Sequence, residues 1–324
     1  LNVTGSAKAS YVIGGNDDGG KGLGISNEIG LGATGELDNG MAWNYKIMLD
    51  PNAGGTIDQD DQTLTLASEM GTAGIFISTG GLSQELAYGI GANGTGSDFA
   101  APMTVTGFGY DVSSYSNLQY HTPADLLPYG IQAKVGFVPN MASSADSADF
   151  KTKGVINNKL MGHTATMYNL SAKPIDGLNV SGAYFETSGA GYTSAPTSGE
   201  LAANYTYGPV KVGYATSYKD VGLSTRAAAV TNYANEAMGI QFAVNDAISV
   251  SWSSEKAEQR TTAAIVAAAT GVVKTTVESE ITSIQVAYNI GGATVGLTQV
   301  EVDDSDYTLL NDEKMTLLTL AMAF

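Results

Sequence analysis

The last eleven residues of the chain, Lys314-Met-Thr-Leu-Leu-Thr-Leu-Ala-Met-Ala-Phe324, alternate between two kinds of side chain and end on an aromatic residue. Successive side chains of a β-strand point to opposite faces, so one face carries an apolar row and the other carries mostly small residues. No charge follows Lys314, whereas a strand of a soluble sandwich usually has a charged or polar outer face. The pattern therefore predicts a wall strand of a closed barrel with its aromatic end at a membrane interface. The apolar row consists of Leu318, Leu320, Met322 and Phe324.

The composition of the whole chain favours the same class. Of 324 residues only 15% are charged, against roughly a quarter in an ordinary soluble domain. The most apolar stretch, 263–273, is much shorter than the roughly 20 residues that a membrane-spanning helix needs. Any membrane crossing must therefore use strands, and these must close into a barrel because backbone groups cannot stay unpaired in hydrocarbon. We expect residues 1–324 to form a single transmembrane barrel domain.

The charge and the start of the chain narrow the partners and the location. The formal net charge of −17 argues against nucleic acid, whose phosphates would be repelled, and leaves cations or small solutes as partners. The chain begins at Leu1 without the charged and apolar regions of an export signal. Either such a signal has been removed or none existed.

Sixteen segments are each near the length of a tilted spanning strand, about 9 to 11 residues, or somewhat shorter. Short turns rich in Gly, Asn and Asp alternate along the chain with longer polar loops. An even number of strands places both chain ends on the side of the short turns. We therefore predict an all-β fold, a sixteen-stranded antiparallel barrel with short periplasmic turns and long extracellular loops. The expected strands are 2–13, 24–34, 41–49, 62–70, 73–79, 115–122, 130–138, 162–172, 177–187, 199–207, 209–218, 235–244, 246–255, 280–289, 292–302 and 314–324.

The apolar residues of each strand define its outward face, and the charges can then be assigned to one side. Most charges within the strands take the opposite, inward parity, as a two-faced sheet requires. A soluble β-protein would also place charges on its polar face, so this supports a membrane barrel only indirectly. Three glutamates, Glu186, Glu280 and Glu301, have outward parity at strand ends beside long loops, where a charge costs little. The inward charges are Lys8, Glu28, Lys46, Glu69, Lys134 and Lys211.

In the order and spacing of these elements the chain resembles the general diffusion porins of Gram-negative outer membranes. The residues that carry the resemblance are the terminal strand ending at Phe324, the hairpin 64–78, and the segment 117–123 that follows a long loop. The resemblance extends over the whole chain, although the Pro-Glu-Phe-like signature of the family's third long loop is missing. It implies an outer-membrane homotrimer in contact with lipid and lipopolysaccharide, with a water-filled lumen in each subunit. It also implies that Phe324 acts as an assembly signal for insertion and that the third long loop folds inward.

That third loop, about residues 80–114, is the longest in the chain, and structureless loops beyond about 15 residues are usually functional or disordered. Its only charged residues are Glu85, Asp98 and Asp111. We expect these carboxylates to form a pore constriction that faces lysines across the lumen and makes the pore mildly cation-selective. The alternative is a solvated surface loop. The lysines expected to line the lumen are Lys8, Lys46, Lys134 and Lys211.

Short motifs that would indicate an enzyme or a cofactor site are incomplete in this chain. The match to GxGxxG at 89–94 precedes no amphipathic helix, and the glycine-rich stretch 15–22 lacks the final Ser or Thr of a phosphate loop. The two histidines, His121 and His163, are too few for a zinc site in a chain without cysteine. No GxSxG elbow is present. We therefore predict no catalytic residues and no bound cofactor.

Acidic clusters in the long loops have the oxygen-rich character of calcium sites, but none has the twelve-residue pattern of an EF-hand. Solvated extracellular charge is the first interpretation, and structural Ca²⁺ is the second. The alanine-rich segment 256–274 is expected to form a short helix or a flap in the seventh long loop. The candidate calcium ligands are Asp58, Asp60, Asp61, Asp303, Asp304 and Asp306.

The sequence thus predicts an outer-membrane porin, a passive channel for small hydrophilic solutes and ions. Transport through such a channel needs only filtering by size and charge. Two alternatives remain, a substrate-selective outer-membrane channel and a non-transporting cell-surface protein built from a soluble β-sandwich. Dependence on detergent would favour either barrel over the sandwich.

Overall fold

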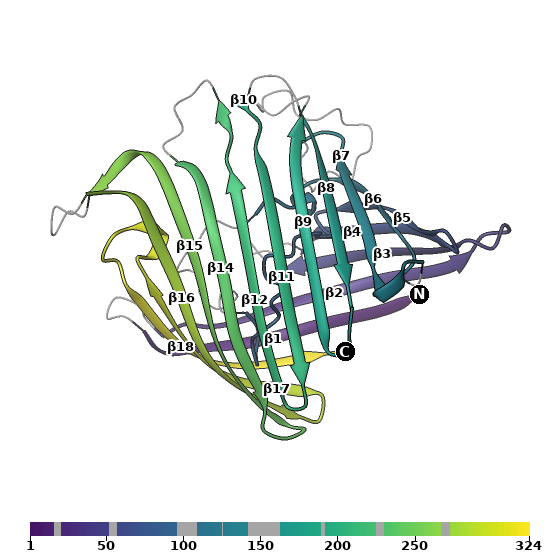
Figure 1. The fold of residues 1–324 in the computed structure, drawn as a ribbon. Coiled ribbons are helices and arrows are strands. Elements are labelled where there is room, and N and C mark those ends of the chain that lie inside the picture. The colour runs from purple at the N-terminus through teal and green to yellow at the C-terminus, as the bar shows by residue number, and fades with distance from the viewer. Residues whose placement is uncertain are drawn as a thin grey trace.

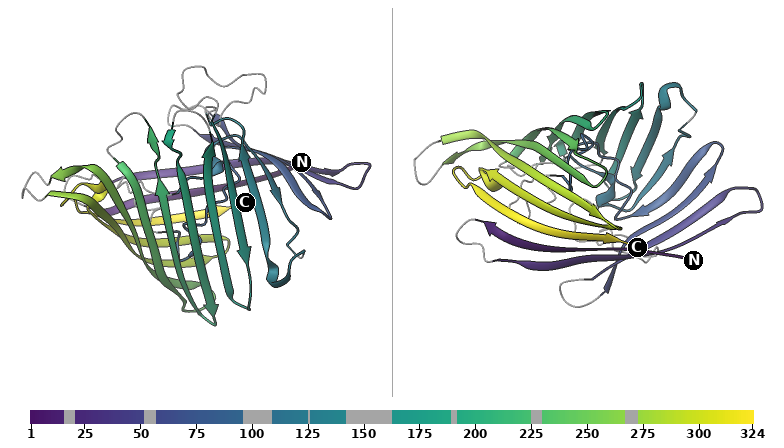
Figure 2. Two further views of the ribbon diagram at one scale, coloured as in Figure 1. Left: turned by 45° about the horizontal axis from the view of Figure 1, so that its top comes forward. Right: turned by 90° about the horizontal axis from the view of Figure 1, so that it is seen from below.

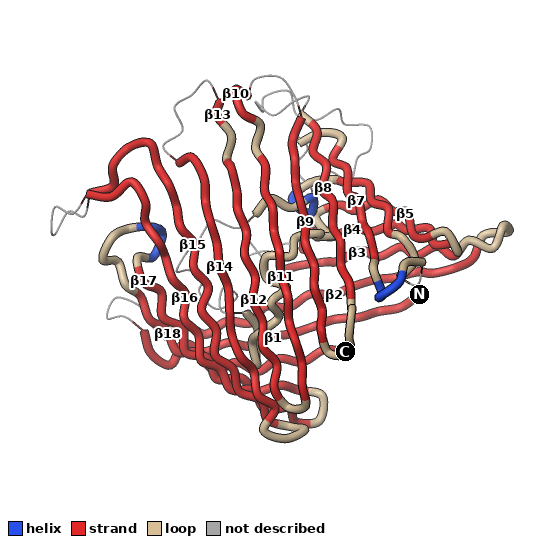
Figure 3. Tube along the Cα trace, in the orientation of Figure 1, coloured by secondary structure: helices blue, strands red, loops and turns tan. Residues whose placement is uncertain are grey.

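The structure is a computed structural model that describes residues 1–15, 21–51, 57–95, 109–124, 126–141, 163–188, 192–224, 230–266 and 273–324. In this part of the chain sixteen antiparallel strands close into one barrel (Figure 1). Each barrel strand pairs with its neighbour along the chain, and the first pairs with the last. Helical structure is limited to short 3₁₀ turns (Figure 3). All sixteen predicted strands occur in the predicted order, so the predicted fold is confirmed.

The barrel strands differ in length, and two of them are much longer than the sequence predicts. They are β1 (Asn2–Gly15), β2 (Leu23–Glu36), β3 (Ala42–Pro51), β4 (Ile57–Ser68), β5 (Gly71–Ile77), β6 (Asn117–His121), β7 (Gln132–Val138), β8 (Thr164–Ala172), β9 (Leu178–Ser188), β11 (Thr197–Tyr207), β12 (Val210–Asp220), β14 (Val230–Ala243), β15 (Ile248–Val266), β16 (Val273–Ile290), β17 (Ala293–Asp303) and β18 (Glu313–Ala323).

Two short strands outside the barrel, β10 (Tyr192–Ser194) and β13 (Leu223–Ser224), pair with each other. They join the long connections β9–β11 and β12–β14. The short turns collect at the opposite end of the barrel. One of them places Gly71 at φ +125°, a backbone conformation that glycine adopts without strain.

Both chain ends lie at the short-turn end, where β1 closes the barrel against β18. The pairing runs from Ser6 opposite Ala323 to Gly15 opposite Met315, with one irregularity near Val12. Beyond it, Gly5 and Phe324 exchange two backbone hydrogen bonds of 2.7 and 2.9 Å. The Phe324 ring covers Gly5 so closely that a Cβ there would lie 2.5 Å from a ring carbon. Phe324 therefore completes the pairing of β1 with β18 that closes the barrel.

Deleting Phe324 should lower the amount of closed barrel, because it removes both terminal hydrogen bonds, worth about 0.5–1.5 kcal/mol each, and the ring contact with Gly5. The measurement is the heat-modifiable gel band of membrane-inserted protein. The variant Phe324→Ala keeps the backbone bonds and loses only the ring, so it should fall between the deletion and the wild type. A deletion variant that inserts at normal yield would contradict this role.

The predicted facing of the strands is confirmed on the half of the barrel formed by β14 to β18. Ile240, Trp252 and Leu318 project outward and are 46%, 40% and 42% exposed. Their chain neighbours Gln241 and Ser251 point inward, where each accepts a hydrogen bond from a segment inside the barrel. The sheet is therefore apolar outside and polar inside, as its alternation predicts.

The expectation of a short helix or flap at 256–274 is wrong for the described part of that segment. There β15 and β16 continue as a hairpin, whose register extends to Val266 opposite Val273. The segment is rich in Thr, Val and Ile, which favour strands, and both strands have partners to pair with. The helix preference of alanine, less than about 1 kcal/mol per residue, is too weak to override such pairing.

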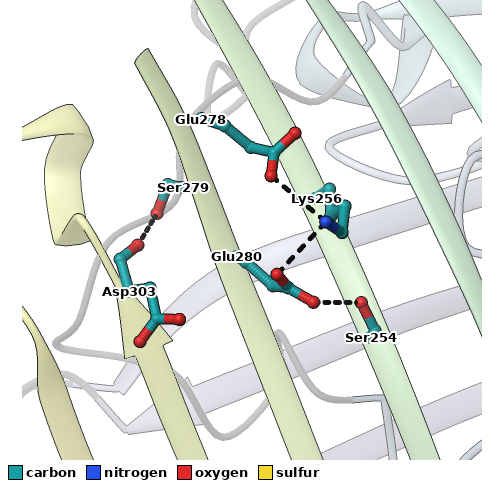
Figure 4. Close-up of polar contacts among 6 residues, drawn as sticks. All are labelled: Ser254, Lys256, Glu278, Ser279, Glu280 and Asp303. Atoms are coloured by element: carbon teal, nitrogen blue, oxygen red, sulfur yellow. Dashed lines mark hydrogen bonds and ion pairs between the residues drawn. The ribbon is translucent and has the colours of Figure 1, made fainter.

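The outward face of β14 to β17 becomes charged towards the long-loop end. Glu236, Lys256, Glu280 and Asp303 stand directly opposite one another in register and form one row across four strands. Lys256 Nζ lies 3.2 Å from carboxylates of both Glu278 and Glu280 (Figure 4). The outward parity expected for Glu280 is confirmed, but it lies well within β16 because this strand is longer than predicted.

No helix in the described ranges is long and apolar enough to cross a membrane.

Candidate functional site

The connection between β5 and β6 enters the barrel and follows its inner wall. Its described parts are 78–95 and 109–116, and the right-hand view of Figure 2 shows the connection within the ring of strands. At its start Asn117 and Gln119 of β6 donate hydrogen bonds to the carbonyls of Thr79 and Gly80, and on β8 Asn169 donates a 2.9 Å hydrogen bond to the carbonyl of Leu82. Further along, the backbone N–H of Gln84 donates to Glu200 on β11. We call the described residues 78–95 and 109–116 the inner loop.

The far part of the inner loop reaches the closing strands of the barrel. The backbone N–H of Ala92 donates to Ser251 on β15 at 2.8 Å, and that of Asn93 donates to Gln285 on β16 at 2.8 Å. The Asn93 side chain also donates to Thr319 on β18 at 2.8 Å. Hydrogen bonds thus tie this one segment to the wall from β6 round to β18.

The part of the wall against which the loop packs is built from small residues. Tyr88 and Ile90 are fully buried and pack against three wall alanines, one each on β11, β12 and β14. Gly213 on β12 is also part of this seat, since a Cβ there would lie 2.0 Å from the carbonyl oxygen of Tyr88. The inner loop can approach this closely only because the wall has no larger side chains at these positions. The three alanines are Ala202, Ala215 and Ala237.

The returning arm of the inner loop is held by Asp111. Its carboxylate accepts hydrogen bonds from the backbone N–H groups of Leu82, Ser83 and Ser113 at 2.9 to 3.1 Å. These bonds join the two arms of the loop. Val112 and Leu82 are buried in an apolar cluster with Phe185 of β9. Asp111 therefore organises the loop itself.

Glu85 is the second carboxylate of the inner loop, and it points into the wall. It is 5% exposed and accepts hydrogen bonds from the Asn235 amide at 2.7 Å and from the Ser217 hydroxyl. It also accepts one from the N–H of Gly109 at 2.6 Å on the returning arm. Burial raises the pKa of Glu85 above its ordinary value, and this effect exceeds the opposing effect of the three donors.

The structure separates the residues expected to form the constriction. Glu85 and Asp111 do belong to a segment inside the barrel, but Glu85 is buried against the wall and does not face lysines across the lumen, whereas for Asp111, which is half-buried, that facing stays a prediction. Their oxygens are used by the N–H and O–H groups of a tightly docked loop, which would otherwise remain unsatisfied. Asp98 lies outside the described residues.

The four expected lumen lysines do not form one cluster. Lys211 on β12 touches the inner loop, since its Nζ would lie 2.9 Å from a Cβ added at Gly89. Lys8, Lys46 and Lys134 take the inward parity of β1, β3 and β7. Of these strands β7 borders the loop, since a Cβ added at Gly136 would lie 3.0 Å from the Leu82 side chain. The expected place of these lysines opposite the loop carboxylate Asp111 stays a prediction.

Three inward residues of the wall were missed at the sequence level. Glu200 accepts hydrogen bonds from the Ser83 hydroxyl and the Gln84 N–H, and Glu255 accepts one from the Tyr88 hydroxyl. Lys219 lies over the rings of Tyr110 and Tyr233, at 4.5 and 5.7 Å from their centres. The same parity rule that was applied to the other charges gives Glu200 an inward position, because its neighbour Leu201 is 65% exposed on the outside. Its role under the loop had no sequence signal.

The candidate calcium ligands are spread over the long-loop end. Asp304 and Asp306 adopt positive φ in a 3₁₀ turn, and the Asp304 carboxylate accepts the N–H of Leu310 at 2.6 Å. The side chains of Asp58 and Asp60 lie outside the described part, and Asp61 and Asp303 lie on β4 and β17. In the ranges that the structure describes, no group of three or more His, Cys, Asp or Glu side chains is arranged to hold a metal ion. Calcium binding stays a prediction.

No protein-family model matches the sequence, and no curated protein matches it either. Solved structures do match along the whole chain. OmpT, an outer membrane protein of Vibrio cholerae, in its trimer form has a TM-score of 0.69 at 12% identity, covering 100% of this chain and 98% of that one. An anion-selective porin from Comamonas acidovorans has a TM-score of 0.67 at 14% identity, covering 100% and 99%. OmpF of Salmonella typhi, solved with daunomycin, has a TM-score of 0.64 at 11% identity, covering 100% and 97%.

At such low identities the likeness is one of fold. The chain has the sixteen-stranded barrel of outer-membrane porins, and the resemblance that the sequence suggests is confirmed at that level.

Proposed function

We propose that the protein is a non-enzymatic diffusion channel of a Gram-negative outer membrane, which passes small hydrophilic solutes and ions. The observation that supports this most strongly is the closed barrel of sixteen strands with a hydrogen-bonded loop inside it. A barrel of sixteen strands is wide enough to leave an aqueous channel. A loop held against one side of the wall would then narrow that channel without blocking it.

The assembly we propose is a homotrimer whose outward faces contact lipid, lipopolysaccharide and the neighbouring subunits. The apolar outward residues support a membrane setting, and a trimer form is described for the similar Vibrio cholerae protein. Calcium held by acidic loops remains a secondary part of this proposal.

For ion selectivity we propose a weak preference for cations. The net charge of −17 favours cations at the pore mouth, but charges there act weakly on an ion deeper in the pore, because at 0.1 M salt the screening length is about 10 Å. The carboxylates of Glu85 and Asp111 are engaged in holding the loop, and the lumen wall carries Lys8, Lys46 and Lys134. The fold leaves the sign open, since one similar structure is an anion-selective porin.

Single-channel recording in a planar bilayer tests the function. Purified protein should produce long-lived conductance steps, and in a KCl gradient the zero-current potential should have the sign of a slight cation preference. That potential should shrink as salt rises, because screening weakens the mouth charges. Closed barrels that insert but conduct nothing would contradict the channel, and saturation by one solute would favour a substrate-selective channel.

A further inference from the structure

Four carboxyl groups meet at the seam between the inner loop and the wall. Glu85 and Asp111 come from the loop, Glu200 from β11 and Glu255 from β15. Glu85, Glu200 and Glu255 are each no more than 5% exposed. Each of these carboxyl groups accepts a hydrogen bond across the seam or between the two arms of the loop, so together they hold the loop in place.

The groups around Glu85 do not balance this negative charge. Ser217 and Lys219 approach it from β12, Asn235 from β14, and Gly109 from the returning arm. Serine, asparagine and the backbone donate hydrogen bonds without carrying charge. The ammonium of Lys219 is the one cation that acts on Glu85 in the described ranges, and it forms no ion pair there.

Lys219 is instead placed over aromatic rings. Its Nζ lies 4.5 Å from the centre of the Tyr110 ring on the returning arm. Tyr233 of β14 lies on another side at 5.7 Å, and Tyr307, from the connection between β17 and β18, packs against Tyr233. Lys211 of β12, which lies against Gly89 of the loop, is the second cation of this region, so the four carboxyl groups outnumber the two lysines named at the seam.

The negative charge of Glu200 is the least compensated of these carboxyl groups. Its Oε2 accepts hydrogen bonds from Ser83 and Gln84, whereas its Oε1 is buried and has no partner in the described structure. That oxygen lies against the backbone, since a Cβ at Gly109 would be 2.1 Å from it. An ionised carboxylate with a buried, unpartnered oxygen is costly, and a proton on the group lowers that cost because it removes the buried charge.

We propose that this seam is a proton-operated latch: shared protons on Glu85 and Glu200 keep the inner loop docked against the wall, and their loss releases it. The latch concerns the lumen of the channel proposed above. It is tested first by the position of the loop, which can be measured whether or not the barrel conducts.

The direction of the effect follows from burial. Burial raises the pKa of Glu85 in the docked loop, and release into water returns it to the ordinary range. The docked state therefore binds more protons than the released state. Docking is complete below the ordinary pKa of a glutamate and is lost as pH rises through the raised pKa. For each proton released, the ratio of docked to released loop should fall by up to about tenfold per pH unit.

The experiment uses two spin labels in the full-length barrel, which has no native cysteine. One is placed by Ala92→Cys on the inner loop, and the other by Ser26→Cys on the inward face of β2. Double electron–electron resonance should show one narrow distance distribution at about pH 5, where the glutamates of the docked loop are protonated. At about pH 9, where they are ionised, a second and broader population should appear. A distribution that is the same at both pH values would overturn the latch.

The pair Glu85→Gln and Glu200→Gln should leave a distance distribution that no longer responds to pH. If that double variant fails to insert, Glu200→Gln alone should roughly halve the pH slope, because one titrating group remains. The matched control is Glu28→Gln, a carboxylate on the inward face of β2 away from the seam, which should keep the wild-type response. A double variant that still responds in full would show that other groups operate the loop.

Recording conductance on the same samples separates the two proposals. Release should raise the open-channel conductance in parallel with the distance change. A pH-dependent distance in a barrel that never conducts would support the latch and contradict the channel, whereas conduction with a fixed loop distance would do the reverse.

Discussion

Replacing Gly213 by valine should displace the inner loop from the wall and raise the single-channel conductance severalfold. Gly213 faces inward on β12, and a Cβ there would lie 2.0 Å from the Tyr88 carbonyl oxygen and 3.0 Å from the Ile90 side chain. These nearest atoms belong to the loop, so the loop must move. Valine suits a strand, and the barrel itself should tolerate it.

The seat of Tyr88 and Ile90 is fully buried, so a Cβ only 2.0 Å from the Tyr88 carbonyl oxygen leaves no room for a partly seated loop, although leaving the seat is costly. Removing Tyr88 and Ile90 from it forfeits about 1.5–3 kcal/mol for each large apolar side chain. Conductance in a planar bilayer and protease cleavage within 80–95 measure the result. The control is Gly24→Val on the inward face of β2, where the nearest atom to a new Cβ is 3.9 Å away. Wild-type conductance with a cleaved loop in Gly213→Val would show that the loop does not limit the pore, and a loop that stays protected would contradict the displacement.

Replacing Leu318 by arginine should destabilise the barrel by about 2 to 4 kcal/mol if this position lies near the middle of the membrane. Leu318 projects outward from β18 beside Leu297 of β17 and Tyr11 of β1. Leu318 and Leu297 are more than 40% exposed in the single chain. An arginine there must enter either lipid or a subunit interface, and both are apolar. Denaturant unfolding of the barrel in lipid vesicles measures the loss.

The matched control is Ser26→Arg on the inward face of β2, which should cost far less because its side chain reaches water in the lumen. Cysteines at the same two positions give an independent check, since a hydrophilic thiol reagent should label 26 and leave 318 untouched. Positions 241 and 251 also face inward, but the inner loop lies against them. They are therefore poorer reporters of the lumen than their parity alone suggests. Equal losses for Leu318→Arg and Ser26→Arg would contradict the assigned facing.

The number, order and facing of the strands could be predicted from the sequence, because these properties depend on local patterns. The alternation that ends at Phe324 defines β18 and its outward row, and the closing pair with β1 follows from the need to leave no strand edge unpaired in a membrane. The same local reasoning failed at 256–274, where composition suggested a helix. There β14 pairs with β15 as far as Thr261 and β15 pairs with β16 as far as Val266, and composition alone does not record the presence of a partner.

The candidate site was predictable only in part. The third long loop was predicted to be functional from its length and its glycine content. The alternation of outward and inward residues placed Lys8, Lys46 and Lys134 inside the barrel. The roles of its carboxylates depended on tertiary contacts between residues far apart in the chain. Asn93 reaches Thr319 across 226 positions, and Ser83 meets Glu200 across 117. No local periodicity encodes such pairs. The sequence by itself therefore determined a two-faced barrel. The path of the loop and the burial of Glu85, which makes this residue an anchor of the loop, depend on the tertiary structure, because only the closed wall brings distant strands around the loop.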